Sequence, residues 1–201
     1  NAQAYIYQLA IKYLYPEYKA NRKLTQITNW GFDTKEDEND AMVSQIVRLI
    51  DYLNLLPVHL LAIPKIEADD VICYLCKQLP NKVTIMSADR DFFQLINNRV
   101  EIYYPPKKKF YKEKEVFEEF GVLPKNFILY KTFLGDKGDN VPKIKGFGDD
   151  KLFKLIPELK EGTKLTLEES LNLMRDESKW KEKIFNFKSQ LEINYKLMDL
   201  S

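Results

Sequence analysis

The sequence predicts an α/β fold in which a parallel sheet is flanked by helices. Three observations support this prediction. Segments with apolar residues at helical spacing alternate with short, continuous apolar runs, as strands and helices alternate in such folds. Acidic clusters directly follow two of these apolar runs. Beyond about residue 110 the pattern becomes almost entirely helical, which predicts a helical part after the sheet.

The first half of the chain contains the predicted sheet. Its elements, in chain order, are expected to be a helix over 40–54, a strand over 58–63, a helix over 67–78, a strand over 82–87, a short helix carrying Phe92, Phe93 and Leu95, and a strand over 99–104. Asn39 or Asp40 could cap the first helix. The acidic, polar stretch 33–40 is expected to be mobile. Both of the first two apolar runs are short enough to be buried parallel strands.

The second half is predicted to be helical. The expected helices lie over 112–120, 124–134, 149–156, 166–175 and 178–195, with a loop rich in glycine and charge over 135–148. At 201 residues the chain can bury one full core, so we expect a single domain. Within it, 1–110 would form the α/β core and 111–201 the helical part.

Composition excludes several classes of protein. The chain has 31 Lys plus Arg against 30 Asp plus Glu, and a near-neutral sum does not exclude nucleic acid because lysines and acids can act on different faces. No apolar run approaches the ~20 residues that span a bilayer, and no signal peptide begins the chain, so we expect an intracellular protein. His59 is the only histidine, which excludes histidine-based nucleophilic schemes. Cys73 and Cys76 lie in an apolar helical run and are expected to be buried thiols.

Seven carboxylates in three short clusters indicate a metal site. They are Glu67, Asp69 and Asp70, then Asp89 and Asp91, then Asp136 and Asp139. The first two clusters each follow a predicted strand, and ligands collect beyond the carboxyl ends of parallel strands. Gathered carboxylates repel one another unless cations neutralise them, and sets of oxygen ligands suit Mg²⁺ or Mn²⁺. The alternatives are a helix whose first turn is acidic, an N-cap with a salt bridge to Arg90, and a solvated turn.

The segment after Asp139 combines glycines with lysines. Glycines ahead of a helix let backbone N–H groups approach a phosphate, and lysines add positive charge. The candidate phosphate-binding residues are Lys143, Lys145, Gly146, Gly148 and Lys151. An acidic cluster followed by such a segment points to a metal-dependent enzyme that acts on a phosphate-rich substrate.

Four motifs in this order and spacing resemble the flap endonuclease or 5′-nuclease family. They are Y-P-E-Y-K-A-N-R from Tyr15, E-A-D-D from Glu67, S-A-D-R-D-F-F-Q-L from Ser87, and G-D-K-G-D-N-V-P-K-I-K-G-F-G from Gly135. The likeness covers about residues 15–153 and is nearest to bacteriophage enzymes and to the 5′-nuclease domain of bacterial DNA polymerase I. It implies a PIN-like core followed by a helix-three-turn-helix module, with its hairpin at about 135–156.

The resemblance also implies roles for individual residues. Glu67, Asp69 and Asp70 would serve one Mg²⁺ or Mn²⁺ site, and the other four acids a second region, as in two-metal hydrolysis of phosphodiesters. Lys19 and Arg22 would contact the scissile phosphate as catalytic residues. The hairpin would hold duplex DNA through its phosphates, in some relatives with K⁺. The expected partners are branched or 5′-ended duplex DNA or an RNA–DNA hybrid, and replication proteins. The expected form is a monomer in the cytoplasm of a bacterial or phage-infected cell.

The sequence departs from the family pattern in two places. Family members begin with an apolar strand that ends in a catalytic Asp, but residues 1–15 contain no Asp. This favours a chain that lacks an opening strand over a relative that has lost its first metal site. Asp149 and Asp150 also stand where relatives usually carry small residues or proline followed by lysine, which would weaken the grip on phosphate.

Three functions remain open from the sequence. A structure-selective 5′-nuclease that cuts at 5′ flaps or 5′ ends is favoured. A PIN-type ribonuclease would lack the glycine-lysine hairpin. A non-catalytic DNA-binding relative would keep the fold without the first metal site. The preference for exonuclease or endonuclease action, and for RNA primer or DNA flap, stays undetermined.

Overall fold

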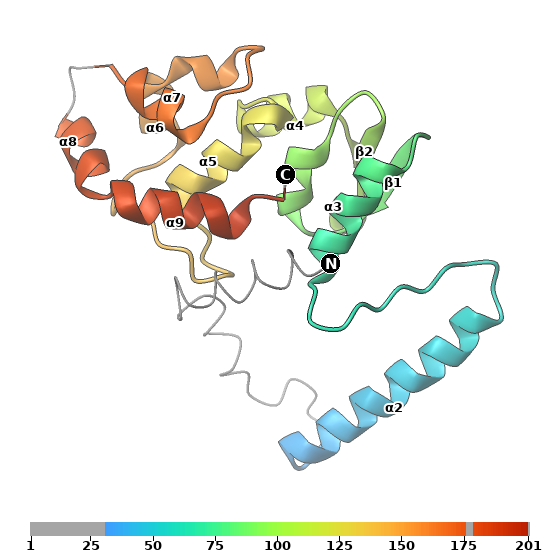
Figure 1. Cartoon of the computed structure of the whole chain (residues 1–201). Helices are drawn as coiled ribbons and strands as arrows, with labels where there is room; N and C mark the ends of the chain where they lie inside the picture. The colour runs from blue at the N-terminus through green and yellow to red at the C-terminus, as the bar shows by residue number, and fades with distance from the viewer. Residues whose placement is uncertain (1–30, 176–178, 201) are drawn as a thin grey trace.

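The computed structural model describes residues 31–175 and 179–200. Lys19 and Arg22, together with the motif that contains them, lie outside the described residues. In the described part, a small sheet lies beside helix α3, and the helices of the second half of the chain lie next to it (Figure 1).

The first described helix, α2 (Lys35–Asn54), begins earlier than predicted. Thr34 is its N-cap and accepts a hydrogen bond from the backbone N–H of Asp37 at 3.1 Å. Acidic side chains in the first turn interact favourably with the helix dipole, and residues 35–40 of the acidic stretch are helical. The mobility expected for 33–40 stays a prediction. Its apolar side chains, including Met42, Ile46 and Leu49, are about half exposed, and the helix projects away from the sheet (Figure 1).

The strand predicted over 58–63 is wrong. These residues form no regular structure, and Val58, Leu60, Leu61 and Ile63 are 40% to 57% exposed. His59 is exposed in the same segment. An apolar run becomes a strand only where a neighbour accepts its backbone hydrogen bonds, and periodicity alone does not supply that information. Within the described residues β1 has a strand on one side only.

The remaining elements of the first half agree with the sequence. Helix α3 (Ala68–Gln78) follows Glu67, which is its N-cap residue, and leads to β1 (Val83–Met86). The 3₁₀ helix η2 (Arg90–Leu95) connects β1 to β2 (Val100–Tyr104), and the two strands pair in parallel. A hairpin through η3 (Pro105–Lys107) adds β3 (Lys109–Tyr111), an antiparallel strand that the sequence did not reveal.

The second half is helical, as predicted. Its elements are α4 (Glu113–Phe120), η4 (Pro124–Asn126), α5 (Phe127–Leu134), α6 (Asp149–Leu155), η5 (Pro157–Lys160), α7 (Leu167–Asn172), α8 (Lys179–Asn186) and α9 (Lys188–Met198). The helix predicted over 178–195 is thus two helices, which meet at Phe187. Helix α9 packs against α5, and the buried Asn194 donates to the carbonyl oxygens of Thr132 and Pro142 at 3.1 and 2.9 Å.

One hydrophobic core joins the sheet to the helices. Phe93 of η2 lies at its centre, with its ring 4.8 Å from that of Tyr111 and 5.4 Å from that of Phe127. Such aromatic contacts add about 0.5–1.5 kcal/mol each beyond the burial of area. The core therefore fixes η2, and with it the acids that follow β1, against α5. Among the described helices none is long and apolar enough to cross a membrane.

Candidate metal and phosphodiester site

Two predicted metal ligands stand where the chain leaves β1. Asp89 is the N-cap of η2, and its Oδ1 accepts a hydrogen bond from the backbone N–H of Asp91 at 2.8 Å. The N-cap part of the alternative reading is therefore present at Asp89, but no ion pair to Arg90 accompanies it among the described residues. It does not account for Asp91, because that carboxylate points to another partner.

That partner is Lys131, in the last turn of α5. Its ammonium group donates to Asp91 Oδ1 and to Asp136 Oδ2, the latter at 2.6 Å. The three side chains are only 13%, 17% and 28% exposed. The structure thus brings the second and third acidic clusters together around one buried cation.

The pKa values of the two carboxylates that bind Lys131 shift in opposite directions. Burial raises the pKa of Asp91 to about 6 even though Lys131 acts in the opposite direction, and repulsion from Asp89 and Asp136 adds to the rise. Burial also acts to raise the pKa of Asp136, but Lys131 and two backbone N–H groups outweigh it, so that pKa is lowered. Lys131 carries one positive charge and faces two carboxylates, so a further cation near them would be attracted.

The loop after α5 holds Asp136 in place. Asp136 Oδ1 accepts hydrogen bonds from the backbone N–H groups of Gly138 and Asp139, at 2.7 and 3.3 Å. Its own backbone pairs with Val141 in both directions. Gly135 enters the loop with φ +66°, and a Cβ there would lie 2.6 Å from the carbonyl oxygen of Val141. Only glycine fits this position without a shift of the backbone.

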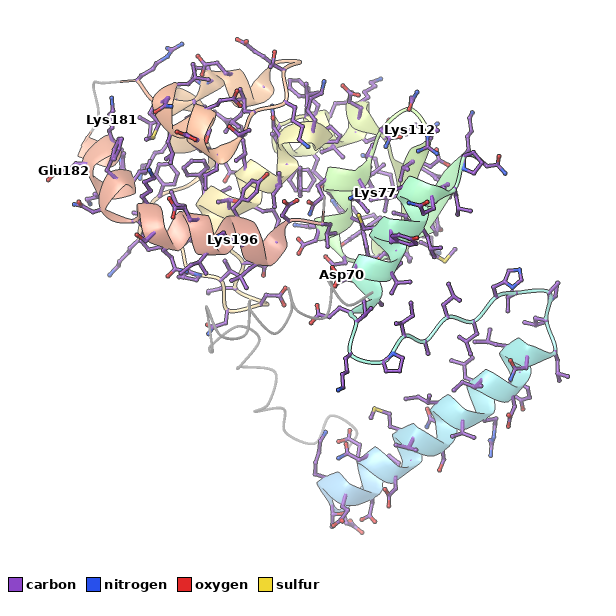
Figure 2. All side chains as sticks on the ribbon, in the orientation of Figure 1. Asp70, Lys77, Lys112, Lys181, Glu182 and Lys196 are labelled. Carbon is purple, nitrogen blue, oxygen red and sulfur yellow. The ribbon has the colours of Figure 1, made fainter. Side chains whose placement is uncertain are left out.

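The first acidic cluster lies at the start of α3. Glu67 is exposed and makes no capping hydrogen bond with its side chain, whereas Asp69 and Asp70 are half-buried. Figure 2 shows Asp70 near the N-terminal end of α3 and Lys77 near its other end. No three His, Cys, Asp or Glu side chains in 31–175 and 179–200 are grouped closely enough to hold one metal ion. The metal roles predicted for all seven acids therefore stay predictions.

Lys131 is the site residue that the sequence reasoning missed. A signal was available, because it is the one charged residue in the mostly apolar stretch from Phe127 to Leu134. A lysine in a buried helix needs an anionic partner. Its spacing of five residues from Asp136 does not correspond to one helix face, so the pairing depends on the turn at Gly135.

The predicted phosphate-binding segment forms an exposed loop. Lys143 and Lys145 are exposed, whereas Phe147 is 2% exposed and anchors the loop in the core. The backbone N–H of Phe147 donates to the Ile144 carbonyl at 3.0 Å, and Gly146 has φ +76°, as the third residue of such a turn requires. Gly148 is the N-cap residue of α6 in extended conformation.

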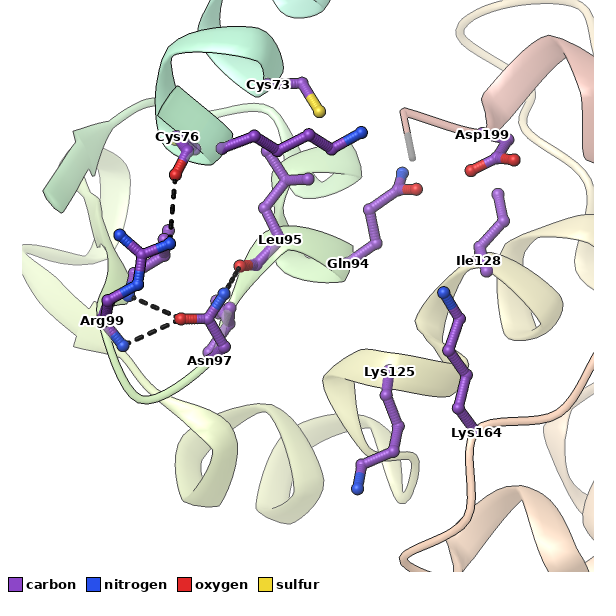
Figure 3. Close-up of a pocket in the computed structure, with 13 residues that line it drawn as sticks. Cys73, Cys76, Gln94, Leu95, Asn97, Arg99, Lys125, Ile128, Lys164 and Asp199 are labelled. Atoms are coloured by element: carbon purple, nitrogen blue, oxygen red, sulfur yellow. Dashed lines mark hydrogen bonds between the residues drawn. The ribbon is translucent and has the colours of Figure 1, made fainter. Parts of the chain in front are cut away.

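A pocket of about 290 Å³ lies apart from these residues (Figure 3). It is lined by both cysteines, by Arg99 and by Lys125 and Lys164, among others, but by none of the predicted metal or DNA-binding residues. Arg99 uses its guanidinium to donate to the Leu79 carbonyl at 2.5 Å. Cys73 and Cys76 are buried free thiols, as predicted.

The fold matches solved structures of a bacteriophage T5 nuclease. The T5 protein co-crystallised with metal ions superposes with a TM-score of 0.76 and 22% identity, covering 94% of this chain and 69% of that one. The T5 flap endonuclease in a pseudo-enzyme-product complex with DNA and metal ions gives a TM-score of 0.74 at 22% identity, with the same coverage. The chain therefore has the PIN-like α/β fold of that endonuclease.

Sequence comparison places the chain in a family. The model of the 5′-3′ exonuclease N-terminal resolvase-like domain matches residues 11–121. A 5′-3′ exonuclease of Aquifex aeolicus is 33% identical over 165 residues, which cover 80% of this chain and 54% of that protein. DNA polymerase I of Mycobacterium bovis is 34% identical over 152 residues, 72% of this chain and 15% of that protein. The chain belongs to the 5′-3′ exonuclease family, and it spans about half the length of the Aquifex relative.

Proposed function

We propose that the chain is the nuclease part of a divalent-metal-dependent 5′-nuclease, which hydrolyses phosphodiester bonds at 5′ ends or 5′ flaps of DNA. The observation that carries this proposal is the pairing of Asp91 and Asp136 with Lys131, next to Asp89 at the start of η2, in a chain of the 5′-3′ exonuclease family. The T5 structures with metal ions and with DNA support the choice of cofactor and substrate.

The donor set fits Mg²⁺ or Mn²⁺. Every predicted ligand is a carboxylate, and hard cations prefer oxygen. Asp89, Asp91, Asp136 and Asp139 would hold one ion, and Glu67, Asp69 and Asp70 the other. Two ions held by these residues would supply an activated water molecule and positive charge at the leaving oxygen. Lys131 keeps Asp91 and Asp136 facing each other and lowers their mutual repulsion.

The substrate would be held through its backbone. Lys143 and Lys145 are exposed on the loop after the acidic site, where phosphates can reach them. Contacts to phosphates carry no sequence information, so recognition would depend on the shape of the DNA.

The test is cleavage of a 5′-labelled flap duplex by the full-length protein, with Mg²⁺ and with EDTA. We expect activity only with Mg²⁺, and a loss of at least about a hundredfold in Asp136→Asn. Asp51→Asn, which removes an exposed carboxylate on α2, is the matched control and should cleave at the wild-type rate. Duplex binding without cleavage in the wild type would favour the non-catalytic relative, and cleavage that persists in EDTA would refute the metal role.

A further inference from the structure

Trp180 on α8 gathers two lysines that come from different helices. The ammonium of Lys151, on α6, lies 4.4 Å from the centre of the indole ring, and that of Lys183, on α8, lies 4.8 Å from it. Both distances are within the ~6 Å over which an aromatic face attracts a cation. The two positive charges are therefore no more than about 9 Å apart.

The same indole contacts the predicted DNA-binding hairpin. The Phe147 ring lies 5.6 Å from it, and a Cβ on Gly146 would lie 3.8 Å from its edge. Trp180 thus links α8 to the turn that carries Lys145 and Gly146. Figure 2 shows Lys181 and Glu182 on α8, at the edge of the molecule.

The paired lysines have hydrogen-bonding capacity to spare. Lys151 donates to the carbonyl oxygen of Gly146, and an ammonium has three donors, so two remain. Among the described residues neither Lys151 nor Lys183 forms an ion pair with a carboxylate. Two nearby cations that form no ion pair repel each other, and a polyanion relieves that repulsion.

Acidic residues lie close to the same hairpin, at the start of α6. Asp149 and Asp150 open α6, where both are exposed, and they place negative charge beside the hairpin. Asp149 accepts a hydrogen bond from the hydroxyl of Tyr130 at 3.0 Å. Lys183 adds a cation from another helix next to Lys151.

We propose that Trp180 and Lys183 extend the phosphate-binding surface of the hairpin onto α8. The indole holds the ammonium groups of Lys151 and Lys183 within about 9 Å of each other, and both contact backbone phosphates of duplex DNA. Trp180 is a positioning residue in this arrangement, and Lys183 is a binding residue. The inference rests on the proposed function, because the contact between hairpin and DNA is itself proposed.

The test measures how the dissociation constant for a duplex depends on salt, in the full-length protein with Ca²⁺ or EDTA so that no cleavage occurs. Each lost phosphate contact lowers the slope of log K against log salt by about 0.9. Lys183→Ala should lower the slope by about one, and Trp180→Leu by one to two. Trp180→Phe, which keeps an aromatic face, should restore much of the loss. Lys114→Ala, which removes an exposed lysine on α4, is the control and should leave the slope unchanged.

The outcomes separate this inference from the proposed function. If Lys143→Ala and Lys145→Ala lower the slope but Lys183→Ala does not, the extension onto α8 is refuted. Phosphate binding by the hairpin is then still supported. If the wild type shows no salt-dependent binding to duplex DNA, both the proposed function and this inference are refuted. Lys183→Ala changes an exposed side chain, so it decides the question even if Trp180→Leu does not fold.

Discussion

At the scale of single residues, one lysine organises the acidic site. Lys131 reaches from α5 to a carboxylate after β1 and to another in the following loop. Those groups are mostly buried, so the structure depends on their neutralisation. Removing one partner of a buried ion pair costs more than the pair contributes, because the remaining charge is left without compensation.

Lys131→Met should therefore destabilise the protein in the absence of metal, by about 2–4 kcal/mol. Urea unfolding followed by circular dichroism measures this change. Lys114→Met, at an exposed pair on α4, should stay within about 0.5 kcal/mol of wild type. Adding Asp91→Asn to Lys131→Met should recover part of the loss, because one buried charge is then removed. An unchanged midpoint for Lys131→Met would contradict the account of the site.

The two thiols provide a prediction that depends on pH. Burial raises the pKa of both Cys73 and Cys76 above the usual value, so little thiolate exists at pH 8. A thiol-reactive dye should therefore label the native protein slowly at pH 8, faster as the pH rises, and completely in denaturant. Rapid labelling of both cysteines in the native state would show that they are accessible.

At the scale of elements, the sequence predicted what local patterns determine. The bounds of α3, β1 and β2 follow from apolar spacing and flanking breakers, and the structure confirms them to within one residue at each end. The sequence pattern did not reveal β3, because this strand is only three residues long and depends on its pairing with β2. The strand predicted over 58–63 fails for the converse reason, since its apolar residues have no paired neighbour among the described residues.

The loop after α5 is an element that depends on one glycine. Gly135→Ala should destabilise the protein by about 1–3 kcal/mol, because the positive φ and the nearby Val141 carbonyl both oppose a side chain. Gly162→Ala is the matched control, since nothing lies within 4 Å of its Cβ position and its φ is not positive. Thermal unfolding of the two variants measures the difference. Equal midpoints would show that the loop can shift to accept a side chain.

At the scale of the whole molecule, the core determines how the acidic clusters meet. Buried residues from α3, β2 and α9 belong to one hydrophobic cluster, which includes Cys76, Ile102 and Leu191. This core contains residues from both sides of position 110, and the division of the chain there stays a prediction. Motif order was sufficient to predict the family and the fold. The contacts of Lys131 and Trp180 were not predicted, because they join residues whose proximity depends on tertiary packing.

We propose that acids from separate segments of this chain form a site for a divalent cation. The most direct test is a titration of the full-length protein with Mn²⁺, followed by the paramagnetic signal of free Mn²⁺. We predict binding by the wild type and by Asp51→Asn, and at least tenfold weaker binding by Asp136→Asn. Equal affinity in all three proteins, or no binding in the wild type, would contradict the account.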